Sequence, residues 1–261
     1  MKLLHQDAAV QLHHGDALGV PIDVQADAFI IDPPWARAGG LHTGRSSAQG
    51  SASDLAGADQ FWAYWFSDVC AKLTSATKPT GHGFVFCDED TYPLLRRCFA
   101  AKSAWAVTQP IVWDRESMGL GSPFRAGHEM IAFARGPSFK WTGSKSLLDV
   151  IRCRWPYGAH PNHGSEKPVD LLVRLMTEYS DLPPGALWLD NFAGSMTSAV
   201  AAARCGRRLW GCELDEDRAI AGVRRYREDT AQLDTAIGRL GAITAEKAAE
   251  PVGPLFGAHT P

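Results

Sequence analysis

The stretch that decides the fold is Ala-Leu-Trp-Leu-Asp (186–190), Asn-Phe-Ala-Gly-Ser-Met-Thr (191–197), Ser-Ala-Val-Ala-Ala-Ala-Arg (198–204) and Arg-Leu-Trp-Gly-Cys-Glu (208–213). A short apolar run bounded by a glycine-containing turn predicts a buried strand, and the alanine-rich segment after the turn predicts a helix. The second apolar run predicts a parallel strand beside the first. A strand, helix and strand in this order predict an α/β fold of three layers, whose ligands lie at the carboxyl ends of the strands.

The rest of the chain repeats this alternation of strands and helices. Further strands are predicted over 27–31, 83–87, 105–113 and 130–134, and helices over 61–72 and 92–101, after Pro168, and from about Glu216. Two stretches without periodicity, 38–57 and 136–164, are interpreted as loops or inserts suited to target recognition. We therefore predict a single domain over 1–240 and a mobile tail over 241–261.

Composition limits the class of protein. The 261 residues are enough for a full core, no apolar run approaches the roughly 20 residues of a membrane span, and the first residues lack the apolar region of a signal peptide. The six cysteines show no C-x-x-C spacing, which argues against a zinc framework or a disulfide scaffold. We expect a cytoplasmic protein with reduced thiols and no membrane partner.

Charge is distributed unevenly along the chain. The net charge is -3, but Arg96 to Arg154 holds ten Lys/Arg against four Asp/Glu, so this middle carries +6. A basic middle in an acidic chain fits one surface that meets a phosphate backbone, and a solvated basic face is the alternative interpretation.

The turn between the two decisive strands has the features of a cofactor site. Gly194 lets the backbone approach a ligand, the following helix presents free N–H groups, and Glu213 ends the next strand with a carboxylate that can accept ribose hydroxyls. The segment lacks G-x-G-x-x-G, which argues against a dinucleotide and favours a nucleoside cofactor. A well-packed turn without a ligand is the alternative.

A second motif, Asp32-Pro33-Pro34-Trp35, follows the predicted strand 27–31. The exocyclic amine of adenine or cytosine is a poor nucleophile, because its lone pair is delocalised into the ring. Asp32 can accept one amino hydrogen and the rigid carbonyl of Pro33 the other, while Trp35 stacks on a base flipped out of the duplex. A surface turn with a packed tryptophan is the alternative interpretation.

These motifs together resemble a known enzyme family. Asp32-Pro-Pro-Trp35, His160-Pro161, Lys167-Pro168, Asp190 to Ser195 and Gly211 to Glu213 occur in the order of the beta group of amino-methylating DNA methyltransferases. The resemblance implies a Rossmann-like methyltransferase fold with a mostly parallel seven-stranded sheet and circularly permuted motifs. It implies S-adenosylmethionine as cofactor and double-stranded DNA as substrate. A homodimer is a further expectation, because the group often dimerises.

The resemblance also assigns roles to residues. The catalytic loop is Asp32, Pro33, Pro34 and Trp35. Cofactor contacts are expected from Asp16, Asp32, His160, Lys167, Pro168, Asp190, Phe192, Gly194, Ser195, Thr197 and Glu213. DNA contacts are expected from basic residues near the catalytic loop and in the basic middle: Arg37, Arg45, Arg115, Arg125, Lys140, Lys145, Arg152 and Arg154. No metal is expected, because His160 and His163 have no partner ligands at zinc spacing.

Some positions depart from the family pattern. Met196 stands where a second glycine is usual, so we expect added bulk at the cofactor turn, with weaker cofactor binding or a reshaped turn. Asn191 replaces a proline, Ser198 replaces a threonine, and Gly164-Ser-Glu166 precedes Lys167 where Thr-Gln is usual. Leu255-Phe256 distantly resembles terminal peptides that dock on sliding clamps, and a loose apolar tail is the favoured alternative.

The leading hypothesis is N6-adenine methylation, because the catalytic motif begins with Asp32, whereas cytosine-N4 enzymes of the family more often begin it with serine. Three alternatives stay open: cytosine-N4 methylation of DNA, adenine methylation of RNA, and a non-catalytic nucleic-acid-binding protein on this fold.

Overall fold

The computed structural model describes residues 1–36, 52–119, 123–155 and 166–249. The strands within these ranges are β1 (Lys2–Gln6), β2 (Val10–His14), β3 (Ala26–Ile31), β4 (Thr77–Cys87), β5 (Ala106–Asp114), β6 (His128–Arg135), β7 (Val150–Arg152), β8 (Leu187–Asp190) and β9 (Arg208–Glu213). The helices are α1 (Ala52–Ser75), α2 (Tyr92–Lys102), α3 (Val169–Thr177), α4 (Thr197–Arg204) and α5 (Glu216–Ala249).

The strands form one sheet in the order β1-β2-β9-β8-β3-β4-β6-β5-β7. Strands β2, β9, β8, β3 and β4 pair in parallel, β6 runs antiparallel between β4 and β5, and β1 is antiparallel to β2. The predicted three-layer, mostly parallel class is therefore confirmed. In the described residues the sheet has nine strands and not seven, because β1 extends one edge and the short β7 extends the other.

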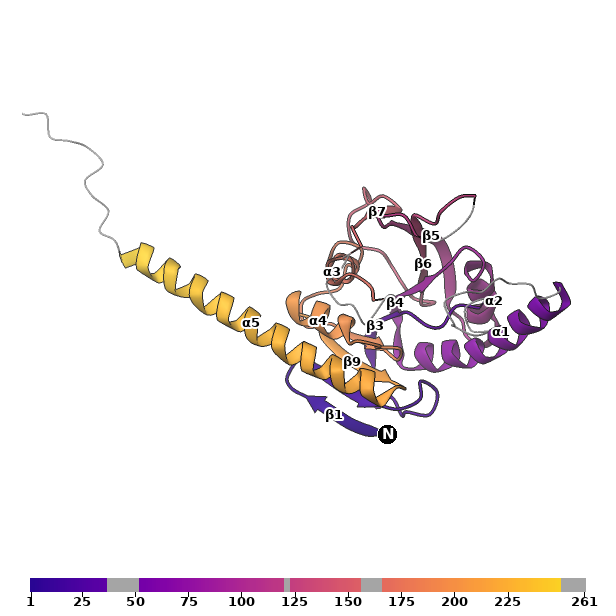
Figure 1. Ribbon diagram of the computed structural model, residues 1–261, viewed down its shortest axis with the longest axis horizontal. Helices are drawn as coiled ribbons and strands as arrows, with labels where there is room; N and C mark the ends of the chain where they lie inside the picture. Colours follow the sequence, from indigo (N-terminus) through magenta and orange to yellow (C-terminus); the bar gives the residue numbers. More distant parts are fainter. Residues whose placement is uncertain (37–51, 120–122, 156–165, 250–261) are drawn as a thin grey trace, which may run out of the picture.

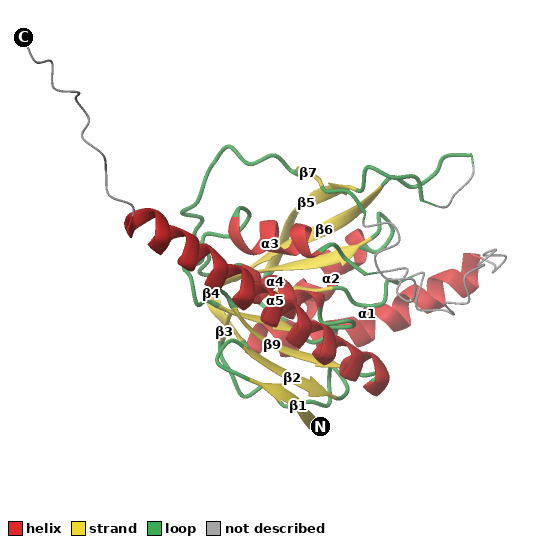
Figure 2. Cartoon of the chain, turned by 60° about the vertical axis from the view of Figure 1, so that its left-hand side comes forward, coloured by secondary structure: helices red, strands yellow, loops and turns green. Residues whose placement is uncertain are grey.

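Helices cover both faces of the sheet (Figures 1 and 2). Side chains of β3 alternate, so that Phe29 and Ile31 pack with α1 and α2, while Ala28 and Ile30 pack with α3, α4 and α5. This alternation gives two apolar cores, one on each face, and fixes the register of the central strands.

The permuted order is visible in the topology. Strand β3, which precedes the Asp-Pro-Pro-Trp loop, lies directly beside β8, which precedes the cofactor turn, although about 160 residues separate them in the chain. Both strands are parallel, so both motifs lie at the same edge of the sheet. The order of the motifs along the chain thus still brings them together.

Three boundaries differ from the sequence-based prediction. Helix α1 begins at Ala52, inside the predicted 38–57 loop, and β7 lies inside the predicted irregular segment 136–164. The three residues of β7 are too few to show a periodicity in the sequence, and they form a strand by pairing with β5. Helix α5 continues to Ala249, past the predicted end of the domain at residue 240, and projects beyond the sheet in Figure 1. The rest of the predicted tail lies outside the described residues.

No helix in the described part of the chain is long and apolar enough to cross a membrane. The cysteines of the described ranges are all unpaired. Four of them, Cys70, Cys87, Cys98 and Cys212, are buried, and burial raises the pKa of each of their thiols.

Candidate active site

Asp32 lies at the carboxyl edge of the sheet, immediately after β3, where the sequence places it. Its Oδ2 is 2.9 Å from Nζ of Lys167, which precedes α3 and is only 7 % exposed. Burial alone would lower the pKa of Lys167, but the carboxylates of Asp32 and Glu129 raise it above its ordinary value. A protonated lysine therefore holds one oxygen of the predicted catalytic carboxylate.

The loop after Asp32 is fixed by hydrogen bonds to two helical segments. The indole Nε1 of Trp62, on α1, donates to the carbonyl of Pro34 at 2.7 Å. The backbone N–H of Ala36 donates to the hydroxyl of Thr91, at the start of α2. Pro33 is buried and Trp35 is half-buried, with its ring 5.2 Å from Nζ of Lys167. The loop is thus held rigidly while part of Trp35 remains accessible for stacking.

Glu129, near the start of β6, is a site residue that sequence reasoning missed. Its Oε2 is 3.1 Å from Nζ of Lys167, and its Oε1 is 3.4 Å from Nη1 of Arg115. The motif comparison likens 109–113 and 128–133 to the family's paired strands beside the target-base pocket, but it assigns no role to Glu129, whose contact with Lys167 depends on the antiparallel pairing of β6 with β4. The available sequence signal was a glutamate placed directly before the apolar run 130–134.

The predicted cofactor turn follows β8 and faces the end of β9. Gly194 adopts a left-handed conformation with φ of +52°, and its N–H donates to Oε2 of Glu213 at 2.8 Å. Asp190 is buried and accepts hydrogen bonds from the Phe192 backbone and the Ser198 hydroxyl; burial, partly opposed by these bonds, raises its pKa to about 7. Hydrogen bonds accepted by the side chains of Asp190 and Glu213 therefore hold the backbone of this turn in place.

Met196 does not enter the space above this turn. It is fully buried, adopts φ of 60°, and packs against Gly222 of α5, where a Cβ would lie 2.4 Å from its Cγ. The prediction of added bulk at the cofactor approach is therefore wrong: the bulk points into the core, and a glycine on the neighbouring helix accommodates it. Met196 nonetheless holds a left-handed position that glycine adopts more readily.

Ser195 and Thr197 belong to a second polar cluster beside the turn. Their hydroxyls are 3.1 Å apart, and Nη1 of Arg225, on α5, donates to both. Arg225 also forms an ion pair with Glu166, which accepts a bond from Thr197. The unusual Glu166 therefore ties the segment before Lys167 to the cofactor turn. Neither Glu166 nor Arg225 was predicted as a site residue.

The other predicted cofactor residues to be placed are Asp16, Pro168 and His160. Asp16 follows β2, next to β9, and its carboxylate caps its own turn by accepting from the N–H groups of Leu18 and Gly19. Pro168 is buried at the start of α3. His160 lies outside the described residues. The catalytic edge thus gathers Asp32, Lys167 and the 190–197 turn, with Asp16 at its margin.

The predicted DNA-contact residues divide into two groups. Arg115, Arg125, Arg152 and Arg154 lie in or beside the segments that end β5 and β7 or connect β5 to β6, at the same edge as Asp32. Lys140 and Lys145 come after the far end of β6 and are exposed, away from that edge. Arg37 and Arg45 lie outside the described residues. Of the basic residues of 96–154 that were predicted to contact DNA, the four arginines therefore lie at the edge that carries Asp32, and the two lysines do not.

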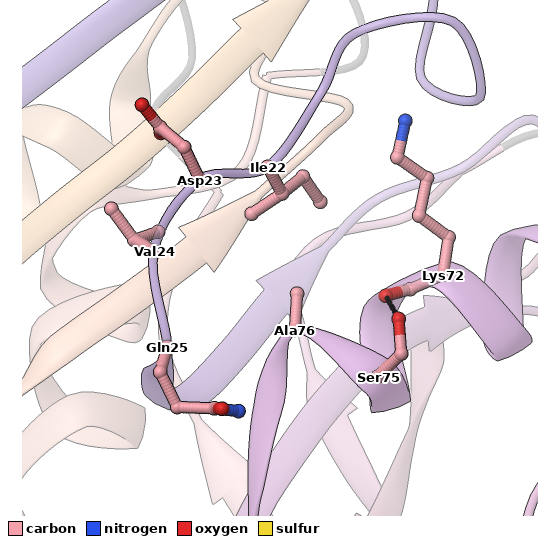
Figure 3. Close-up of a pocket in the computed structure, with 7 residues that line it drawn as sticks. All are labelled: Ile22, Asp23, Val24, Gln25, Lys72, Ser75 and Ala76. Atoms are coloured by element: carbon pink, nitrogen blue, oxygen red, sulfur yellow. Dashed lines mark hydrogen bonds between the residues drawn. The ribbon is translucent and has the colours of Figure 1, made fainter.

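A hollow of about 540 Å³ lies at the opposite, amino edge of the sheet (Figure 3). Its lining residues come from the segment before β3 and from the end of α1: Ile22, Asp23, Val24, Gln25, Lys72, Ser75 and Ala76. Lys72 turns away from the other lining residues, and its ammonium donates to the carbonyls of Leu18 and Val20. The hollow takes no part in the catalytic edge.

Comparisons with known proteins agree with this geometry. Residues 26–221 match the family model of the N6/N4 DNA methylases. The chain is 26 % identical to the DNA adenine methyltransferase YhdJ of Escherichia coli over 81 % of each chain, and 42 % identical to the putative methylase YubD of the same organism over 31 % of this chain.

Solved structures share the fold. The M1.HpyAVI complex with SAM superimposes with a TM-score of 0.64 at 19 % identity, over 83 % of this chain and 98 % of the other. The cytosine-N4-specific PvuII DNA methyltransferase superimposes with a TM-score of 0.66 at 14 % identity, over 88 % and 93 % of the two chains.

Proposed function

Because the chain belongs to the DNA methylase family, we propose that it methylates adenine N6 in double-stranded DNA. Family membership confirms the resemblance inferred from the motifs, including the enzyme class and S-adenosylmethionine as cofactor. The observation that carries the proposal is the position of Asp32. Its carboxylate stands beside the cofactor turn with Oδ2 held by Lys167, which leaves Oδ1 to accept a proton-bearing group.

The residues of the turn fit a cofactor of this chemistry. A Cβ on Gly194 would meet nothing closer than the Phe192 carbonyl at 3.9 Å, so the backbone faces open space on that side. Glu213 supplies a carboxylate for ribose hydroxyls, and the Ser195 and Thr197 hydroxyls add polar partners. We propose that these residues hold S-adenosylmethionine, which supplies an electrophilic methyl group when bound.

The remaining chemistry is assigned to the Asp-Pro-Pro-Trp loop. Asp32 Oδ1 would accept one hydrogen of the exocyclic amine and the Pro33 carbonyl the other, which shifts the nitrogen towards tetrahedral geometry. Trp35 would stack on the flipped base. Trp62 and Thr91 act by keeping this loop in place, since productive geometry requires that the acceptors be fixed before the base arrives.

Adenine is favoured over cytosine on two grounds. The motif begins with an aspartate, and a relative over most of the chain is named an adenine methyltransferase. The DNA surface would include Arg152 and Arg154, which are exposed at the edge that carries Asp32. Since the substrate would be cellular DNA, we place the enzyme in the cytoplasm. The homodimer stays a prediction, and clamp docking through Leu255-Phe256 concerns residues outside the described ranges.

The test is base identification after methylation in vitro. Unmethylated double-stranded DNA is incubated with the protein and labelled S-adenosylmethionine, digested, and separated into nucleosides. We expect label in N6-methyl-2′-deoxyadenosine with the wild type and with Asp217→Ala, an exposed control on α5, and none with Asp32→Ala. Label in N4-methyl-2′-deoxycytidine would reject the adenine assignment. Preferential labelling of a competing RNA would reject DNA as substrate, and cofactor binding without transfer to either would reject the enzyme.

A further inference from the structure

Four charged side chains form a connected line at the catalytic edge. Arg115 follows β5, Glu129 lies near the start of β6, Lys167 precedes α3, and Asp32 follows β3. The successive contacts are Nη1 to Oε1 at 3.4 Å, Oε2 to Nζ at 3.1 Å, and Nζ to Oδ2 at 2.9 Å. The charges alternate in sign, so each interior member is held between two opposite charges.

Burial gives this line its strength. The side chains of Lys167 and Glu129 are 7 % and 9 % exposed, whereas Asp32 is 31 % exposed. The Lys167 ammonium is also 5.2 Å from the Trp35 ring and 5.3 Å from the Phe86 ring. A buried charge is stable only when it is paired, so the ammonium depends on both carboxylates. Removal of one carboxylate would leave the buried ammonium paired with the other alone.

The outer end of the line is anchored to the backbone. Nη2 of Arg115 donates to the carbonyl of Ala126 at 2.7 Å, in the segment that connects β5 to β6. The guanidinium therefore fixes one oxygen of Glu129, and the other oxygen faces Lys167. This arrangement restrains Lys167 from the side opposite Asp32.

We propose that Glu129 is a positioning residue for methyl transfer: it holds Lys167 on Oδ2 of Asp32 and so keeps Oδ1 available for the target amine. The inference rests on the proposed methyl transfer, but not on which base is methylated. Without the Glu129 charge, the ammonium would move fully onto Asp32 and straddle its two oxygens. It would then compete with the amino hydrogen that Asp32 is required to accept.

The first test is Glu129→Gln, which keeps the size of the side chain and removes its charge. We expect the single-turnover methylation rate to fall about 10–100-fold, the range found for residues that orient metal ligands in enzymes. The KM values for S-adenosylmethionine and DNA should change much less than the rate. Unchanged turnover, or a loss confined to the KM values, would overturn the proposal.

A double-mutant cycle with Lys167→Met separates positioning from general damage. If Glu129 acts through Lys167, the double variant should be no slower than Lys167→Met alone. A multiplicative loss would show that Glu129 acts independently of Lys167. Glu178→Gln is the control, because it also removes a glutamate charge that is paired with an arginine, Arg174, but at an exposed position. It should leave the rates of the wild type and of Lys167→Met unchanged.

Glu129→Asp covers the case in which the glutamine variant fails to fold. It keeps the charge and withdraws the carboxylate from Lys167 by one methylene. The proposal is supported if Glu129→Asp slows methylation in the wild-type background but causes no further loss in the Lys167→Met background. A wild-type rate, or a loss that persists in that background, contradicts it. A wild type that methylates no base would overturn the proposed function as well; a methylating wild type matched by the Glu129 variants overturns this inference alone.

Discussion

Gly222→Ala tests whether the cofactor turn owes its shape to the neighbouring helix. The new Cβ would lie 2.4 Å from Cγ and 3.0 Å from Cβ of Met196, and 3.0 Å from the backbone carbonyl carbon of Ser195. The flexible end of the methionine cannot relieve these contacts, because two of the three involve its Cβ and the backbone. Either α5 or the turn has to move.

The expected magnitude follows from two opposing effects. Overpacking of a filled core costs about 1–3 kcal/mol, and replacing glycine by alanine inside a helix contributes about 1 kcal/mol in the other direction. We expect the free energy of unfolding to fall by about 0–2 kcal/mol, together with a higher dissociation constant for S-adenosylmethionine, because Ser195 is displaced.

The assays are chemical denaturation and calorimetric titration of the cofactor. The double variant Met196→Gly/Gly222→Ala serves as the control, since removal of the methionine makes room for the alanine and glycine readily adopts the left-handed φ of 60°. Its cofactor affinity should return towards that of the wild type. A Gly222→Ala protein about 1 kcal/mol more stable than the wild type, with unchanged cofactor affinity, would refute the reasoning.

Three further predictions concern side chains whose roles the structure separates. Trp62→Phe removes the indole donor to the Pro34 carbonyl and should slow single-turnover methylation. Trp141→Phe is the control, because it also loses an indole-to-carbonyl hydrogen bond but at a distant exposed site, and it should keep the wild-type rate. Equal rates for the two variants would contradict a role for Trp62 in holding the Asp-Pro-Pro-Trp loop. The wild type should lose stability relative to Asp190→Asn as pH rises from about 4 to about 7. The reason is that the native Asp190 carboxyl keeps its proton up to a pKa of about 7, whereas the unfolded one ionises near 3.8. A difference in denaturation midpoint that does not change with pH would contradict this prediction. The wild type should lose stability as pH falls from 6.5 to about 4, because burial lowers the pKa of the native His82 ring to about 4 while the unfolded ring takes up its proton near 6.5. His82→Leu should not show this loss. Equal changes in the free energy of unfolding of both proteins over this pH range would exclude His82 as its cause.

The central fold could be predicted because its signals are local. The apolar runs of β3, β8 and β9 and the alanine-rich α4 carry their own periodicity, and the prolines after Asp32 mark where β3 ends. The edge strands could not be found in the same way. Strand β1 is mostly exposed and polar, and β7 has three residues, so both depend on pairing with a neighbour.

The positions of Asp32 and of the 190–197 turn were predictable for the same reason, because each follows a buried strand. Met196 shows where this reasoning stops. A motif comparison treats position 196 as part of the turn, but its side chain direction follows from a left-handed φ and from a glycine 26 residues later on α5. No local pattern links these two positions.

Glu129 extends this point from packing to electrostatics. In the sequence it is one acidic residue at the start of an apolar strand, and the charge of 96–154 counts it only as a subtraction from a basic segment. The antiparallel pairing of β6 with β4 places it beside Lys167, where its buried carboxylate joins the line of charges that ends at Asp32. The arginines of this segment therefore differ in their surroundings: Arg152 and Arg154 are exposed at this edge, whereas Arg115 is engaged with Glu129 at one end of the line of charges that ends at Asp32.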